Sequence, residues 1–218
     1  MEHTELTPVA GQTKQVDKTA YHFEKYAGQD RFVSYHAQLA EIVRARPESI
    51  MEVGVGDGVV GDYLKRNTNI AYTSLDIADD VGADVLGSVT ALPFPDKSFD
   101  VTCAFEVLEH LPFDQFDSAL AELARVARKK VLVSIPHFGP PVKLYLKIPF
   151  FPALRFGFKI PYPRVHVFNG QHYWEVGKRG YSVGTIRKHF EKRFVIEKEY
   201  VPFDNQYHRV YALLPKEV

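Results

Sequence analysis

Residues 50–58 constrain the fold of this chain more than any other segment, because an apolar run there passes through three alternating glycines straight into a helical pattern. The run reads Ile50-Met51-Glu52-Val53-Gly54-Val55-Gly56-Asp57-Gly58. Glycines let a backbone turn sharply and approach a ligand closely, and a helix that follows offers free amide groups at its N-terminus. The segment therefore predicts a strand, a ligand-binding turn and a helix, although a plain strand-to-helix turn has the same local form.

Short apolar runs alternate with helix-like stretches along the rest of the chain. The β-type runs are 49–55, 70–76, 83–86, 98–105 and 130–135, and the helices are placed at 59–66, 114–128 and 182–192. Because tight turns cannot join parallel neighbours, this alternation predicts a parallel sheet with crossover helices. Two last runs, 193–201 and 207–214, are joined by a short connector, which predicts an antiparallel hairpin and one reversed strand.

A carboxylate stands at the end of the second run, in Ser74-Leu75-Asp76-Ile77, 22 residues after Gly54. Doubly wound nucleotide-binding folds hold ribose hydroxyls with an acid at this place, whereas a strand-end aspartate can instead cap a helix. With the glycine turn, Asp76 predicts a ligand that contains adenosine. The acid Glu52 ahead of the glycines favours a ligand with a cationic end, such as S-adenosylmethionine, over the phosphates of NAD.

Two further segments follow the glycine turn in a fixed order. They read Ala91-Leu92-Pro93-Phe94-Pro95-Asp96-Lys97-Ser98-Phe99-Asp100-Val101 and Phe105-Glu106-Val107-Leu108-Glu109-His110-Leu111-Pro112. Over residues 48–136 the chain thereby resembles the class I S-adenosylmethionine-dependent methyltransferases of the small-molecule type, in which L-P-F-x-D-x-S-F-D precedes L-E-H. The resemblance implies a Rossmann-like α/β fold, with a seven-stranded, mostly parallel sheet, an antiparallel last strand and helices on both faces. It also implies S-adenosylmethionine as cofactor and S-adenosylhomocysteine as its product.

The resemblance assigns the contacts of the cofactor to individual positions. It implies that Glu52 and the glycines line the methionine end, that Asp76 holds the ribose and that Ile77 lies against the adenine. The expected cofactor-binding residues are Glu52, Gly54, Gly56, Gly58, Asp76, Ile77, Ser88, Val89 and Phe105. The chain departs from the family after the third strand, where Ser88 and Val89 replace an acid, and an uncharged contact to the adenine is weaker than a charge-assisted one.

Proton transfer is needed if the methyl acceptor is a hydroxyl, because neutral alcohols are poor nucleophiles. Ligands of such sheets bind beyond the carboxyl ends of the strands, which points to Glu106 after the fourth strand and His137 after the fifth as catalytic residues. His137 is the leading candidate for the base, with a structural loop histidine as the alternative. In relatives, the segment of Glu109 and His110 more often ties the loop to the next helix.

Residues 137–181 interrupt the strand–helix rhythm and hold seven Lys or Arg, one acid and eleven aromatic residues. This asymmetry is informative, because the whole chain balances 27 basic against 27 acidic residues. The segment lies where relatives build a cap over the acceptor. A cap with its own core, contact with an anionic bilayer, an RNA strand and a soluble acidic substrate all stay open. His172 and Trp174 are expected to face the acceptor, with a buried anchoring role for Trp174 as the alternative.

One domain with a single core is expected, because 218 residues are too few for two full-sized domains. We place a helical lid at 1–47, whose first 14 residues are polar and mobile, and the catalytic domain at 48–218 with a substrate-cap insertion at 137–181. Tyr21 and Tyr26 of the lid are expected to cover the cofactor. The start carries no export signal, no apolar run is long enough to span a membrane, and the single cysteine permits no internal disulfide, which favours the cytoplasm.

The function predicted from sequence is thus S-adenosylmethionine-dependent methyl transfer to an unidentified small-molecule or lipid-linked acceptor, with the methylated atom open. The alternatives are a catalytically inactive S-adenosylmethionine-binding regulatory or scaffold protein and an RNA methyltransferase. An NAD-dependent oxidoreductase is disfavoured by Glu52. Peripheral membrane contact through 137–181 is compatible with a cytoplasmic protein, whereas the zero net charge disfavours nucleic acid. No metal site is expected, and the oligomeric state is left open.

Overall fold

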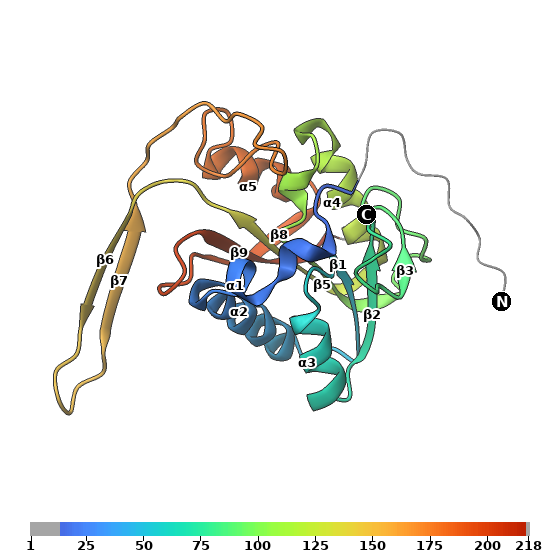
Figure 1. Ribbon diagram of the computed structural model, residues 1–218, viewed down its shortest axis with the longest axis horizontal. Helices are drawn as coiled ribbons and strands as arrows, with labels where there is room; N and C mark the ends of the chain where they lie inside the picture. Colours follow the sequence, from blue (N-terminus) through green and yellow to red (C-terminus); the bar gives the residue numbers. More distant parts are fainter. Residues whose placement is uncertain (1–13, 217–218) are drawn as a thin grey trace.

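A computed structural model describes residues 14–216, so the expectation of a mobile start falls almost wholly outside the described residues. Seven strands form one sheet: β1 (Ser49–Val53), β2 (Ala71–Asp76), β3 (Val85–Leu86), β4 (Phe99–Phe105), β5 (Ala127–Pro136), β8 (Phe194–Tyr200) and β9 (His208–Pro215). Their order is β3-β2-β1-β4-β5-β9-β8 (Figure 1). Strand β9 is antiparallel to β5 and β8, and the other pairs of this sheet are parallel. The predicted sheet with one reversed strand is confirmed.

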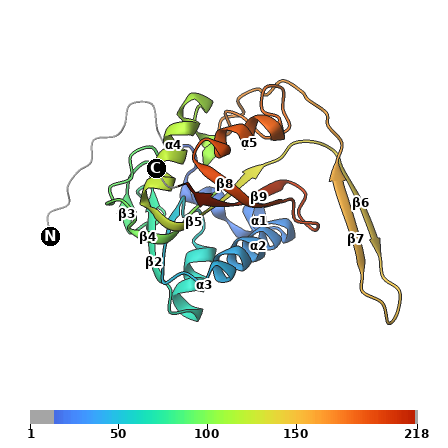
Figure 2. The same ribbon diagram turned by 180° about the vertical axis from the view of Figure 1, so that it is seen from behind.

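Helices cover both faces of the sheet (Figures 1 and 2). Helices α2 (Gln29–Ala45) and α3 (Val59–Asn67) lie on one face, and α4 (Phe116–Val126) and α5 (Val183–Glu191) lie on the other. Helix α4 buries Phe116, Leu120 and Leu123 completely, because their spacing of three and four residues puts them on one side of the helix. The core is therefore divided by the sheet into two apolar layers.

Short helical turns complete the chain before and after the first strands. These are η1 (Lys18–Tyr21), α1 (Phe23–Tyr26), η2 (Leu108–His110) and η3 (Phe113–Gln115). Helix α2 begins after Gly28 and ends where Arg46 takes a left-handed backbone conformation before Pro47. The helix predicted at 114–128 is shorter, because Ala127 already pairs with Phe99 as the first residue of β5.

The insertion contains a long β-hairpin that extends away from the main sheet (Figures 1 and 2). Its strands β6 (Pro141–Leu146) and β7 (Leu154–Lys159) form a sheet of their own. We name residues 141–159 the arm. Residues directly opposite in such a pair lie on the same face, so the register of the arm defines two unlike faces. One face carries Val142, Leu144, Leu146, Leu154, Phe156 and Phe158, and the other carries Lys143, Tyr145, Arg155 and Lys159.

The arm turns its basic face toward the connection between β8 and β9. Arg155 pairs with Asp204 at 3.3 Å, and the Lys143 ammonium lies 5.8 Å from the ring centre of Phe203. The apolar face consequently points to solvent, and all six of its side chains are exposed. Within residues 14–216, no helix combines the length and the apolar character that crossing a bilayer requires.

Candidate active site

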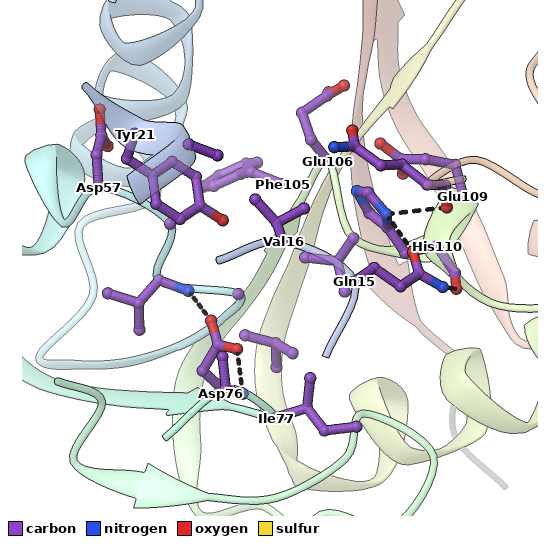
Figure 3. Close-up of a pocket in the computed structure, with 18 of the residues that line it drawn as sticks. Gln15, Val16, Tyr21, Asp57, Asp76, Ile77, Phe105, Glu106, Glu109 and His110 are labelled. Carbon is purple, nitrogen blue, oxygen red and sulfur yellow. Dashed lines mark hydrogen bonds between the residues drawn. The ribbon is translucent and has the colours of Figure 1, made fainter. Parts of the chain in front are cut away.

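A cavity of about 400 Å³ opens beyond the carboxyl ends of β1, β2 and β4 (Figure 3). The turn after β1, the end of β2, the segment after β4 and the N-terminal residues of the described chain supply its lining. Asp76 and Ile77 lie at one end, Glu106, Glu109 and His110 lie at the other, and Phe105 stands between them. This volume falls within the range of small-molecule and cofactor sites.

The glycine turn forms one wall of the cavity. Gly54, Gly56 and Gly58 have φ angles of 80°, 58° and 77°, a region that favours glycine. A Cβ atom on Gly54 would also overlap the Cγ2 methyl group of Val107. Gly54 and Gly56 line the cavity, whereas Gly58 lies just outside it as the N-cap of α3.

Asp76 holds the turn in place and faces the cavity at the same time. Its carboxylate accepts hydrogen bonds from the backbone N–H of Val55 at 2.8 Å and of Ala78 at 2.9 Å. The structure has no helix between β2 and β3, both of which are fully described, so Asp76 does not act as a helix cap. Because a carboxylate offers about four lone-pair sites, it retains capacity for two hydroxyl groups of a ligand.

The other expected cofactor residues fall into two groups. Ile77, Val89 and Phe105 line the cavity, and so does the buried carboxyl of Glu52, which accepts a hydrogen bond from the Tyr72 hydroxyl. Burial raises the pKa of Glu52 to about 7. Ser88 is not part of the lining, because its hydroxyl is 2.9 Å from that of Thr90 within its own loop.

Residues 14–26, which we name the strap, cross the cavity from the N-terminal side. Tyr21 and Tyr26 line the cavity with their rings in edge-to-face contact at 4.8 Å, and Tyr21 lies against Gly56. Polar contacts hold the strap: Gln15 donates to the backbone oxygen of His110 at 3.0 Å, and the backbone N–H of Lys18 donates to Asp80 at 3.1 Å. The two tyrosines are thus placed where a lid would cover a cofactor.

Glu106 occupies the far end of the cavity in a left-handed backbone conformation, with φ of 56°. Such a conformation costs on the order of 1–3 kcal/mol for a non-glycine residue, and it gathers at functional sites. The side chain lies 3.0 Å from Nε2 of His208, whose Nδ1 lies 2.6 Å from the Ser34 hydroxyl. Burial raises the pKa of Glu106 to about 7 and lowers the pKa of His208 to about 3. At neutral pH, Glu106 is therefore near the midpoint of its titration, while the His208 ring is neutral.

Charged and titratable groups surround Glu106 from several elements. They are Arg31 on α2, Glu109 and His172 in the cavity lining, Glu175, and His208 on β9. The Tyr207 hydroxyl, also in the lining, donates to Glu175 at 3.3 Å. This end of the cavity is therefore built for proton transfer or for binding a polar group.

Glu109 and two histidines complete the same end. Glu109 is fully buried, and neither of its carboxylate oxygens has a hydrogen-bond partner among the described residues. Nδ1 of His110 lies 2.9 Å from Oε1 of Gln15, and Nδ1 of His172 lies 3.0 Å from the carboxylate of Glu175. Burial lowers the pKa of His110 to about 4, so its ring is neutral at pH 7.

The structure does not bring His137 into the cavity, which corrects its placement as the leading base. Its Nδ1 accepts a hydrogen bond from Nε of Arg209 at 3.2 Å, and its backbone N–H donates to the backbone oxygen of Tyr207 at 2.6 Å. Burial lowers the pKa of this imidazole to about 3. His137 thus packs beside β9 at the base of the arm and fits the structural alternative.

From the insertion at 137–181, only Gln171 and His172 line the cavity. His172 lines the cavity, and its contact with an acceptor stays a prediction. Trp174 is fully buried among aromatic side chains, and its indole N–H donates to the backbone oxygen of Leu111 at 3.1 Å. The anchoring alternative for Trp174 is therefore correct, and the domain boundaries within the insertion stay a prediction.

Sequence reasoning missed His208 and Tyr207 as part of this site. A signal was present: a reversed strand beside β5 brings its first residues to the edge where β5 ends. The sheet order β5-β9-β8 is what puts these residues beside Glu106, and the length of the connector alone does not determine that order.

Comparison with known proteins agrees with this arrangement. Residues 51–135 match the family described as "Methyltransferase domain". A fatty-acid O-methyltransferase of Mycolicibacterium smegmatis is 36% identical over 107 residues, which cover 43% of this chain and 38% of that protein. The alignment thus spans well under half of the curated relative.

Solved structures extend the likeness over most of the chain. The 1,6-didemethyltoxoflavin-N1-methyltransferase of Burkholderia thailandensis, crystallised with S-adenosylhomocysteine, superposes with a TM-score of 0.61 at 13% identity, over 91% of this chain and 85% of that chain. The magnesium protoporphyrin IX methyltransferase of Synechocystis superposes with a TM-score of 0.54 at 15% identity, over 88% and 85%. At these identities the likeness shows a shared fold.

Proposed function

We propose that this chain, whose residues 51–135 match a methyltransferase domain, is a class I S-adenosylmethionine-dependent methyltransferase that transfers a methyl group to a small molecule held at the Glu106 end of the cavity. S-adenosylmethionine supplies a methyl group that its sulfonium has already activated. The turn at Gly54 and Gly56 receives the methionine end, and Asp76 accepts hydrogen bonds from the ribose hydroxyls. Tyr21 and Tyr26 of the strap exclude water from above.

One observation carries this proposal: a single cavity joins the glycine turn and Asp76 to the titratable cluster at Glu106, with Phe105 between the two ends. Methyl transfer needs donor and acceptor aligned in one water-excluded space. Such alignment contributes on the order of 7–11 kcal/mol to the lowering of the barrier in favourable cases. A scaffold protein without catalysis has no need of the second, titratable end.

Glu106 and His208 are the residues to which we assign proton acceptance, in place of His137. They lie 3.0 Å apart at the acceptor end, and burial brings the pKa of Glu106 close to neutrality, which suits a general base. The left-handed backbone of Glu106 aims its side chain at the cavity. A hydroxyl of the acceptor would lose its proton to this pair as its oxygen attacks the methyl carbon.

Titration with S-adenosylhomocysteine tests cofactor binding. Calorimetry should show one site in the wild-type protein, no binding of NAD, and a loss of at least about tenfold in affinity for Asp76→Asn, because one hydrogen bond to a carboxylate contributes about 1.5–3 kcal/mol. Asp79→Asn is the matched control, since Asp79 is exposed and lies outside the cavity lining. Folded protein that binds no S-adenosylhomocysteine would refute the proposal.

For the acceptor, we infer an oxygen atom on a small apolar or lipid-linked molecule. The proton-accepting pair supports oxygen as the attacking atom, and the partial likeness to a fatty-acid O-methyltransferase supports an apolar acceptor. Incubation with labelled donor and a panel of fatty acids, long-chain alcohols and apolar phenols tests this inference. Label transferred only to nitrogen or thiol compounds would contradict it.

We also propose that the arm binds an anionic membrane surface. The apolar face of the arm is open to solvent, and its tip exposes Ile148, Phe150 and Phe151, with Phe150 wholly exposed. Lys143 and Arg155 face the connection between β8 and β9, whereas Lys147 at the tip is exposed; the whole of residues 137–181 carries seven basic side chains and one acid, an excess that favours an anionic bilayer. An arm of this kind would hold the enzyme beside a membrane in which an apolar acceptor is dissolved.

Vesicle sedimentation tests the role of the arm. Wild-type protein should bind vesicles that contain anionic lipid more strongly than neutral vesicles, and Phe150→Ser with Phe151→Ser should abolish binding. Tyr63→Ser is the matched control, because Tyr63 is an exposed aromatic residue of α3, far from the arm. If the wild-type protein is instead a dimer in solution and the same double substitution makes it a monomer, the apolar face binds a second copy of the chain.

A further inference from the structure

The Glu109 carboxyl lacks the partners that a buried acid normally has. It is fully buried, both of its oxygens are without a hydrogen-bond partner among residues 14–216, and it lines the cavity. Glu106, three residues earlier, adds a second acid to the same end of the cavity. Burial and the neighbouring Glu106 raise the pKa of Glu109. Buried carboxyls are normally paired or bound to a metal, so this one calls for a partner that the polypeptide does not supply.

Each of two histidines beside Glu109 has an oxygen acceptor facing its Nδ1 atom. Nδ1 of His110 faces two oxygens, Oε1 of Gln15 at 2.9 Å and the Gln171 carbonyl at 3.1 Å, so this nitrogen carries the proton. Nδ1 of His172 faces the Glu175 carboxylate at 3.0 Å and carries the proton as well. When a ring carries its proton on Nδ1 alone, its lone pair is on Nε2. An acceptor that holds the far N–H of a ligand histidine is the usual outer support of a metal site.

The three side chains also converge. One ligand atom from each of Glu109, His110 and His172 lies within 4.8 Å of the other two, and the two imidazole rings stand edge to face at 5.1 Å. A tetrahedral cation with bonds of about 2.0–2.2 Å holds its ligands roughly 3.4 Å apart. Small side-chain rotations would therefore close the three ligand atoms around one ion.

We propose that Glu109, His110 and His172 bind one divalent transition-metal cation at the acceptor end of the cavity. Two imidazoles and one carboxylate favour Zn²⁺, Fe²⁺ or Co²⁺ over Mg²⁺ or Ca²⁺, which prefer oxygen ligands alone. Binding would displace the proton from Glu109 and leave coordination positions open toward the cavity. The expectation from sequence of no metal site overlooked this set, because His172 is 62 residues from His110 along the chain.

The role of the cation, though not its binding, rests on the proposed function. A cation held by Glu109, His110 and His172 would lower the pKa of an acceptor hydroxyl placed beside it and so favour loss of its proton at neutral pH. Glu106 and His208 would then receive the proton that this oxygen releases. The strap contributes to the site as well, because Gln15 holds the proton side of the His110 ring.

Titration of chelator-treated, full-length protein with Zn²⁺ and Co²⁺ tests the binding step. Calorimetry should show one equivalent with Kd at or below about 10 μM, and Co²⁺ should gain the intense visible absorption of a low-coordinate site. Glu109→Gln and His172→Ala should each weaken binding at least about tenfold. Glu109→Gln keeps the shape of the protonated acid, and its melting temperature shows whether it folds. His36→Ala is the matched control, since His36 is an exposed histidine of α2.

The outcomes separate this inference from the proposed function. Absence of a saturable site in wild-type protein, or equal affinity in wild type, Glu109→Gln and His172→Ala, would overturn the metal site. Binding of S-adenosylhomocysteine is measured on the same samples. If it binds and the metal does not, only the metal site fails; if the metal binds and S-adenosylhomocysteine does not, only the proposed function fails.

Discussion

Substitution of Gly54 by alanine probes how closely the glycine turn is packed against the segment after β4. Two costs arise at this position. The φ angle of 80° places alanine in the left-handed region, at about 1–2 kcal/mol. The new Cβ also overlaps Cγ2 of Val107, and overpacking of this kind costs about 1–3 kcal/mol. We therefore expect Gly54→Ala to lower the free energy of unfolding by about 2–5 kcal/mol.

Gly58→Ala is the matched control. Its φ of 77° carries the same backbone cost, but apart from its chain neighbours no atom of residues 14–216 lies within 4 Å of the added Cβ, so a loss of only about 1–2 kcal/mol is expected. Val107→Ala removes the Cγ2 methyl group that the new Cβ atom of residue 54 overlaps. The double substitution Gly54→Ala with Val107→Ala should therefore be less destabilising than the sum of the two single changes, with a coupling energy of about 1–3 kcal/mol.

Urea unfolding followed by the fluorescence of the single, buried tryptophan, Trp174, measures these changes. Calorimetry with S-adenosylhomocysteine on the same variants shows whether the displaced turn also loses ligand affinity. If Gly54→Ala is no more destabilising than Gly58→Ala, or if the double substitution shows no coupling with Val107, the close approach at this turn is refuted.

Three other changes have outcomes that the structure determines. Trp174→Ala should lower the free energy of unfolding by about 3–5 kcal/mol, and Trp174→Phe by less, in thermal melts; an unchanged melting temperature would contradict its place in the core. His137→Ala should lower the melting temperature, because Arg209 loses its partner, while methyl transfer in the folded fraction is retained; a selective loss of kcat would restore His137 as a base. Burial raises the pKa of Glu106 to about 7, so the fraction of its proton-accepting form increases as the pH rises through 7. The rate of methyl transfer to a hydroxyl acceptor should therefore increase from about pH 6 to about pH 8. If Glu106→Gln shows the same pH profile as the wild type, Glu106 is excluded as the base.

The donor side of the site could be predicted from the sequence because local pattern determines it. The strand, the glycine turn and Asp76 lie within 27 consecutive residues, and parallel pairing of β1 with β2 brings Asp76 next to the turn. The same holds for the sheet as a whole, since alternating strands and helices allow few other topologies.

The acceptor side depends on contacts between segments far apart in the chain, which no local pattern specifies. His208 reaches Glu106 only because β9 inserts between β5 and β8. His172 reaches His110 through the return path of the insertion, and Gln15 reaches it from the other end of the described chain. The prediction of His137 in the cavity was wrong for a related reason. The end of β5 lies beside Arg209 of β9, so His137 packs against that strand and does not line the cavity.

The strap that crosses the cavity is fastened mainly at the protein surface. The Lys14 ammonium forms an ion pair with Asp80, and the backbone N–H of Lys18 donates to the same carboxylate; water reaches both contacts, so each stabilises the strap only weakly. Tyr21 and Tyr26 of this segment line the cavity, so under the proposed function a bound donor would lie beneath them. Release of its demethylated product would then require the strap to open, and the rate of turnover would depend on that opening as well as on the chemical step.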